Sequence, residues 1–242
     1  MIKTLWNTIL YKPLANALIF LMSVIPGGDV GIALIILTIV VKLILFPLTQ
    51  KSIKSQVAMR EIEPDLAKIK AEGLSKEEEA KRTMALYKDK KVNPFSGCLV
   101  ILIQFPIIIA LYQVFLRGLK DVAGLPLYSF VHLPAHINTM FLGLIDMSGK
   151  SLVLAILAGL TQFIQMQIVM PKKAAKPAST DKPKFTDQMM QNMQWQMRYF
   201  LPVFIAFVAY GISAAVALYW VTSNSVTIVQ ELFVRRKLVK QP

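Results

Sequence analysis

The residues of this chain that could do chemistry are few, and none forms a familiar catalytic motif. The sequence contains no GxxxxGK[ST] loop, no HExxH and no GxSxG. Cys98 is the single cysteine, which excludes an internal disulfide, a CxxC redox pair and a cysteine-rich zinc site. The two histidines, His132 and His136, fall together in one segment between apolar runs. We therefore expect no catalysis, no nucleotide hydrolysis, no cofactor and no metal.

What remains is a set of polar side chains inside long apolar runs. Lys42 and Thr38 are four residues apart and share one helix face. A lysine near the centre of a membrane-spanning helix costs about 2.5 to 3.5 kcal/mol on membrane-insertion scales. The position of Lys42 within its apolar run therefore indicates a function or a polar environment. At a similar depth the other runs carry Gln104, Gln162, Gln165, Trp220, Ser223, Asn224 and Thr227. We predict that these nine residues form a hydrophilic groove in the inner leaflet, open to the cytoplasm.

Simpler interpretations of these residues stay open. Thr, Gln and Asn often join membrane helices through hydrogen bonds worth under about 1 kcal/mol each. Lys42 lies seven residues before Thr49, so its side chain could extend to the interface. The outer halves of the runs are almost wholly apolar, as in GIALIIL and SLVLAILAGL. The shared depth of the polar residues favours the groove.

The elements that must position these residues are membrane spans. Hydrophobic residues make up 55% of the 242 residues, charged residues only 17%, and the mean hydropathy is +0.53, which is too apolar for a soluble domain. About 20 apolar residues in a helix cross a bilayer. We predict an all-α integral membrane protein with five transmembrane helices, at 30–48, 96–116, 151–170, 198–211 and 212–233. A tight turn over 210–213 separates the last two.

Basic residues set the predicted orientation. The net charge is +13, and most of the 27 Lys and Arg residues fall in 49–95, 171–197 and 234–242. The positive-inside rule places these three segments in the cytoplasm, the last as a short basic tail. The loop 117–150 is then extracytoplasmic. The N-terminus is outside and the C-terminus inside.

Two further segments are predicted to be helical. Residues 1–29 read as an N-terminal interfacial amphipathic helix on the outer surface, because Lys12 and Pro13 would lie near the bilayer centre of a sixth span. Within 49–95, apolar residues recur at helical spacing, and Ser75 with Glu78 forms a capping box. We expect a cytoplasmic helical hairpin there, either a solvated spacer or a docking arm.

Three segments closely resemble the YidC-type membrane protein insertases of bacteria. They are KVNPFSGCLVILIQFPIIIALYQVF (91–115), LTIVVKLILFPLT (37–49) and ALYWVTSNSVTIVQ (217–230). The resemblance implies five core helices around a hydrophilic groove and contact of Thr38 and Trp220 with the entering substrate. Relatives usually carry an arginine where this chain has Lys42, so the charge is kept while bidentate carboxylate binding is lost. It also implies a bacterial cytoplasmic membrane location.

The resemblance predicts an insertase that moves hydrophobic segments and short polar tails of clients into the bilayer without nucleotide hydrolysis. The implied partners are nascent membrane proteins and the lipid bilayer, with the ribosome and the Sec translocon as further candidates and no specific nucleic acid binding. The alternative is a small membrane transporter or channel with Lys42 as an anion site. Apolar outer halves and the lack of a detectable inverted repeat argue against it. A purely structural assembly subunit would leave the groove unexplained.

Overall fold

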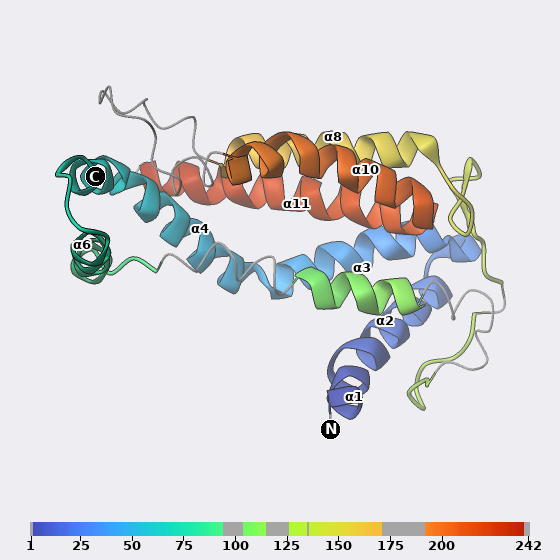
Figure 1. Cartoon of the computed structure of the whole chain (residues 1–242). Coiled ribbons are helices and arrows are strands. Elements are labelled where there is room, and N and C mark those ends of the chain that lie inside the picture. The colour runs from blue at the N-terminus through green and yellow to red at the C-terminus, as the bar shows by residue number, and fades with distance from the viewer. Residues whose placement is uncertain (1, 94–103, 115–125, 135, 171–191, 240–242) are drawn as a thin grey trace.

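The computed structural model describes residues 2–93, 104–114, 126–134, 136–170 and 192–239, and helices dominate it (Figure 1). The N-terminal half contains α1 (Ile2–Trp6), the π-helical turn η1 (Asn7–Tyr11), α2 (Lys12–Val24), the 3-10 turn η2 (Pro26–Gly28), α3 (Val30–Ile44), α4 (Phe46–Glu61), α5 (Glu63–Ala71) and α6 (Lys76–Asp89). An apolar helix follows over Gln104–Val114. The C-terminal half contains β1 (Met140–Phe141), β2 (Ile145–Asp146), α8 (Leu152–Val169), η4 (Gln196–Phe200), α10 (Leu201–Ile212) and α11 (Ala214–Val239).

The helix α11 is the centre of the bundle. It packs against α8 and α10 on one side and against α3 and α4 on the other (Figure 1). Its first residues, Ala214 to Trp220, are all buried. The predominantly helical architecture predicted from the sequence is confirmed.

By length and apolar composition, two described helices could cross a membrane. They are α8 and the helix over Asn192–Ile212, and the number rises to three if the bent pair α3 and α4 is counted as one span. Of the predicted span 96–116, only 104–114 is described, as an apolar helix, and the rest lies outside the described residues. Polar residues lower the hydropathy of α11. Five transmembrane helices therefore remain a prediction.

The first predicted span, 30–48, is divided by a bend. The axes of α3 and α4 differ by 62°, and the break lies at Leu45. Pro47 explains it, because proline has no N–H and its ring clashes with the carbonyl of the residue four positions before it. Most of α4 lies within 49–95 and forms the first helix of the hairpin predicted there.

The hairpin of α4, α5 and α6 is held together by few contacts. The Ser75 hydroxyl accepts a hydrogen bond from Glu78 N at 3.3 Å, so the Ser75 half of the predicted capping box is present. The helix α6 has no buried residue, and its Met84 is 56% exposed. Arg82 pairs with Glu72 at 2.5 Å, but both side chains are exposed. Exposed ion pairs contribute up to about 1 kcal/mol, so we expect these arms to separate easily.

The turn between α10 and α11 lies where the sequence predicts it. Ser213 is extended between the two helices, with φ −160° and ψ 159°. The helix α11 then continues to Val239, through most of the segment assigned to the basic tail, 234–242. Arg236 and Lys237 in its last turn interact favourably with the negative end of the helix dipole. This interaction favours the extension of the helix beyond the apolar run.

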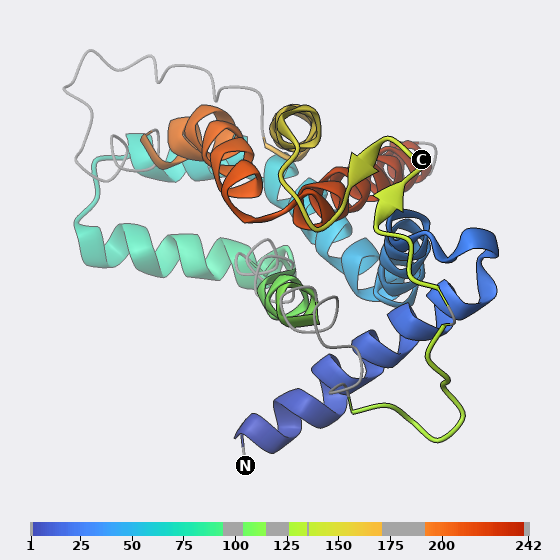
Figure 2. The same ribbon diagram turned by 90° about the vertical axis from the view of Figure 1, so that its right-hand side faces the viewer.

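The N-terminal helical segment, α1 to α2, extends away from the bundle (Figure 2). Its polar face binds the loop that precedes the strands. Asn16 Nδ2 donates to Pro126 O at 3.1 Å and Asn16 Oδ1 accepts from Tyr128 N at 2.6 Å. Lys12 Nζ lies 4.8 Å from the centre of the Tyr128 ring. The interfacial position of residues 1–29 stays a prediction.

The loop with β1 and β2 joins the starts of α3 and α11. Asp29 caps α3, because its Oδ1 accepts from Gly31 N at 2.8 Å, and its Oδ2 accepts from Leu142 N at 2.8 Å. At the start of α11, Ala214 N donates to Gly149 O at 2.8 Å. One buried carboxylate therefore holds both a helix N-terminus and the strand loop.

We expect Asp29→Ala to lower the thermal unfolding midpoint by several degrees, because losing an N-cap costs about 0.5 to 2 kcal/mol and the loop anchor is lost as well. Circular dichroism of the purified chain in detergent measures this. Asp29→Asn keeps one acceptor oxygen but places an amide donor where the other was, so it should retain one of the two contacts and unfold between the wild type and Asp29→Ala. Asp146→Ala, which removes an exposed acceptor of Ser148 N, is the matched control. An Asp29→Ala midpoint equal to that of Asp146→Ala would contradict the anchoring role.

Candidate functional site

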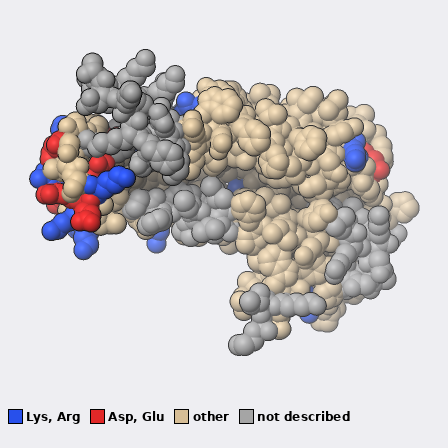
Figure 3. All heavy atoms as spheres, in the orientation of Figure 1, with Lys and Arg blue, Asp and Glu red and all other residues tan. Residues whose placement is uncertain are grey.

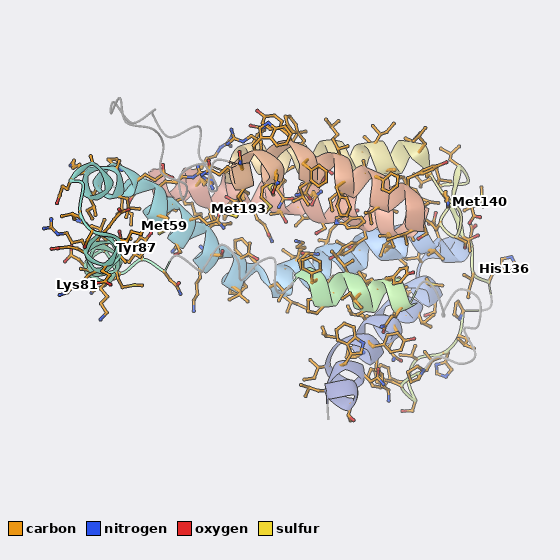
Figure 4. The ribbon with its side chains drawn as sticks, in the orientation of Figure 1. Met59, Lys81, Tyr87, His136, Met140 and Met193 are labelled. Carbon is orange, nitrogen blue, oxygen red and sulfur yellow. The ribbon has the colours of Figure 1, made fainter. Side chains whose placement is uncertain are left out.

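On the face drawn in Figure 3, charged side chains lie mainly at the two ends of the molecule, and few lie between them. Charged side chains gather over α5 and α6, which we call the hairpin end, and a smaller group lies at the opposite, loop end (Figure 3). Lys81 and Tyr87 mark the hairpin end, and His136 and Met140 mark the loop end (Figure 4). Between the ends, large apolar side chains on α8 and α10 are exposed, among them Ile156, Val203 and Phe207. An exposed apolar band of this kind fits contact with lipid.

Lys42 lies buried between three helices. Its Nζ donates to Gln104 Oε1 at 3.0 Å and to Thr227 Oγ1 at 3.0 Å. The residue is 9% exposed, and it forms no ion pair with a carboxylate in the described part of the chain. An ammonium group has three N–H donors, so these contacts leave one for another acceptor. Lys42 is therefore a buried cation held by neutral oxygen atoms.

Other polar groups surround these contacts and complete what we call the polar centre: Lys42, Gln104, Tyr219, Thr227 and Gln230. Gln104 Nε2 donates to the Tyr219 hydroxyl. Gln230 Nε2 donates to the Lys42 carbonyl oxygen at 3.2 Å. The three members on α11 recur at helical spacing and form one stripe. The polar centre thus links α3, α11 and the helix over Gln104–Val114.

A second group of polar residues lies between α8 and α11. Asn224 Nδ2 donates to Thr161 Oγ1 at 3.3 Å. Gln162 is buried on α8. Gln165 Oε1 is buried and accepts no hydrogen bond from the residues that the structure describes. This group joins two helices and leaves an acceptor atom available.

The nine residues proposed from the sequence therefore separate into two groups. Lys42, Gln104 and Thr227 touch one another, whereas Asn224, Gln162 and Gln165 belong to the α8 side. Thr38, Trp220 and Ser223 are buried, and the Thr38 hydroxyl donates to Leu34 O at 2.7 Å within its own helix. All except Gln104 and Gln165 are buried, so in this structure they fill a packed interior and do not line an open groove.

Sequence reasoning missed two residues of this region. Tyr219 precedes Trp220 and lies four residues before Ser223, a spacing that could have placed it on the polar stripe. Arg60 donates to Ile168 O at 3.2 Å and to Val169 O, which ties α4 to the end of α8. Burial, and then the nearby Arg235, lower the pKa of the Arg60 guanidinium from its ordinary value. No local pattern distinguishes Arg60 from the other basic residues of its segment.

The fold and the polar centre define a helical membrane protein with a charged group in its interior. A family described as the 60Kd inner membrane protein matches residues 20–241. The chain belongs to this family, that of the YidC membrane protein insertases. The resemblance of the three sequence segments is thereby confirmed.

Individual relatives carry the name membrane protein insertase YidC. The chain is 32% identical to the protein of Oceanobacillus iheyensis, over 97% of this chain and 85% of the relative. It is 31% identical to that of Fusobacterium nucleatum, over 94% of this chain and 98% of the relative. It spans only 39% of the Pelobacter propionicus protein, to which it is 33% identical. A crystal structure described as an active YidC insertase shares the fold, with a TM-score of 0.55 at 21% identity over 93% of this chain and 45% of that one.

We expect Thr227→Val to destabilise the chain by about 1 to 3 kcal/mol, because the buried ammonium of Lys42 loses one acceptor. Thr222→Val is the matched control, since Thr222 Oγ1 donates only to Leu218 O within α11 and its loss should cost little. Thermal unfolding of both variants in detergent distinguishes them. Equal midpoints would show that the contact between Lys42 and Thr227 does not stabilise the bundle.

Proposed function

We propose that this chain is an insertase that moves hydrophobic segments and short polar tails of client proteins from the cytoplasm into the bilayer. The observation that carries the proposal is the buried ammonium of Lys42, which has only neutral acceptors among the described residues. Membership of the insertase family supports it. No observation favours the alternative of a transporter or channel, because buried residues in the loop-end halves of α3 and α11, such as Leu34 and Leu218, are apolar.

The client's own transfer free energy drives the proposed reaction. About 20 apolar residues, each worth up to about −0.5 kcal/mol at the membrane centre, supply several kcal/mol. The opposing cost is the passage of a polar tail through hydrocarbon. Polar groups in the inner half of the membrane shorten that passage, so no covalent chemistry and no nucleotide hydrolysis is required.

Lys42 contributes a transient attraction to acidic residues in the tail. Two unit charges about 4 Å apart attract by about 4 kcal/mol at the effective dielectric constant of a protein surface. Desolvation offsets part of this attraction. The remainder favours entry of the tail without trapping it. Under this proposal the nine residues named above contact the client when the packed interior opens.

The proposed topology has five spans: α3, the helix containing Gln104–Val114, α8, α10 and α11. The hairpin end is cytoplasmic and the loop end lies outside, in a bacterial cytoplasmic membrane. The positions of Lys81 and His136 at opposite ends of the molecule support this assignment (Figure 4). So does the excess of basic residues in 49–95.

Cysteine labelling of intact cells tests the orientation. In a Cys98→Ala background, we expect a membrane-impermeant maleimide to label His136→Cys from outside, because this exposed residue lies at the loop end. Lys81→Cys, exposed at the hairpin end, should react only after permeabilisation. Labelling of Lys81→Cys in intact cells would overturn the topology.

The charge of Lys42 is tested with two clients that differ only in acidic residues of the translocated tail. Lys42→Leu should reduce insertion of the acidic client about ten-fold, which corresponds to about 1.4 kcal/mol, and spare the uncharged client. Lys42→Arg should retain activity and Lys42→Glu should repel the acidic tail. Insertion is measured as the fraction of tail protected from protease.

Lys51→Leu provides the control, because it removes an exposed lysine from the neighbouring helix α4. It should leave both clients unaffected. An equal loss of both clients in Lys42→Leu would contradict charge pairing and leave Lys42 as a general hydration site. No loss of either client would mean that the charge of Lys42 plays no part in insertion.

A further inference from the structure

An apolar slot of about 430 Å³ lies between α3, α4 and α11 and is open to the surface. Ile39, Leu43 and Phe46 form one wall, and Val226, Val229 and Phe233 form the other. Leu43 is 60% exposed and Val229 is 66% exposed. These residues lie in the halves of α3 and α11 nearest the hairpin end and, for Phe46, at the start of α4. The slot is therefore an apolar surface at the depth of one membrane leaflet.

A basic side chain lies at the hairpin-end mouth of the slot. Lys237 Nζ is 4.4 Å from the centre of the Phe233 ring, and the Phe233 ring is 6.5 Å from that of Phe46. Lys237 is exposed and forms no ion pair with a carboxylate within the described ranges. It follows Phe233 by four residues, one helical turn, on the same face. The ammonium is thus held above the apolar walls and is available to an anion.

We propose that this slot holds an acyl chain of an acidic phospholipid whose phosphate group pairs with Lys237. The walls match hydrocarbon, and the cation lies where a lipid headgroup meets water. From Val226 to Phe233 the helix α11 rises about 10 Å, which is about two thirds of the hydrocarbon depth of one leaflet. A purely apolar occupant, such as a client helix, would match the walls but leave Lys237 without a partner. The inference requires that the chain lies in a bilayer and does not depend on insertase activity.

Native mass spectrometry of the full chain tests this proposal. The chain is extracted from vesicles of equal parts phosphatidylglycerol and phosphatidylcholine, and the retained lipid is identified. The wild type should retain phosphatidylglycerol preferentially. Lys237→Gln should reduce that preference about five-fold, the effect expected for one basic residue at an anionic surface, and Lys237→Arg should keep it. Val229→Trp should block the slot and reduce retention of phosphatidylglycerol.

Two matched variants control for charge and for bulk. Arg236→Gln removes the adjacent basic residue, and Val203→Trp adds the same bulk at an exposed position on α10. Both should retain lipid as the wild type does. Equal retention of the two lipids by the wild type, or an equal effect of Lys237→Gln and Arg236→Gln, would overturn the proposal. The comparison of Lys237→Gln and Lys237→Arg with Arg236→Gln tests the proposal even if Val229→Trp fails to fold.

Discussion

The burial of the Lys42 ammonium is the constraint on which the arrangement of the helices depends. A buried charge costs several kcal/mol unless it is hydrogen-bonded. The acceptors here come from two other helices, Thr227 on α11 and Gln104 on its own short helix. A shift of one residue would rotate either acceptor by about 100° and remove it from Lys42. The polar centre therefore fixes the register of three helices whose apolar surfaces alone would tolerate sliding.

The two ends of the bundle are held by different kinds of interaction. At the loop end, the buried Asp29 and the backbone contact between Ala214 and Gly149 fasten two helix starts to the same loop. At the hairpin end, α4 leaves α3 at the bend near Leu45, and the exposed ion pair of Arg82 with Glu72 joins α6 to the end of α5. Local opening costs least where few apolar groups are buried. Motion should therefore be concentrated at the hairpin end, which is the end proposed to receive clients.

Hydropathy predicts those parts of this fold that depend on local composition. It identifies the run that forms α8 and the turn at Ser213, and a charge inside an apolar run identifies Lys42. It does not find Tyr219, because a tyrosine beside Trp220 reads as apolar surface and its partner Gln104 is 115 positions away. Contacts between distant segments leave no periodic trace in a single sequence. The packing of the predicted groove residues into a closed interior could not be predicted for the same reason.

The neutral partners of Lys42 leave its charge available. A carboxylate at the position of Thr227 would form a buried ion pair with Lys42. Separating Lys42 from that partner would then be costly, because removing one partner of a buried pair costs about 3 to 5 kcal/mol. The one acidic residue of α11 is Glu231, one turn further along, and its side chain is only 3% exposed. Arg235 Nε binds Glu231 Oε2 at 2.7 Å within the same helix. Arg235, and not Lys42, pairs with this carboxylate, and the partner of Lys42 on α11 is the neutral hydroxyl of Thr227. The charge of Lys42 is therefore not neutralised within the described residues, which under the proposed function leaves the ammonium able to attract a carboxylate of the client.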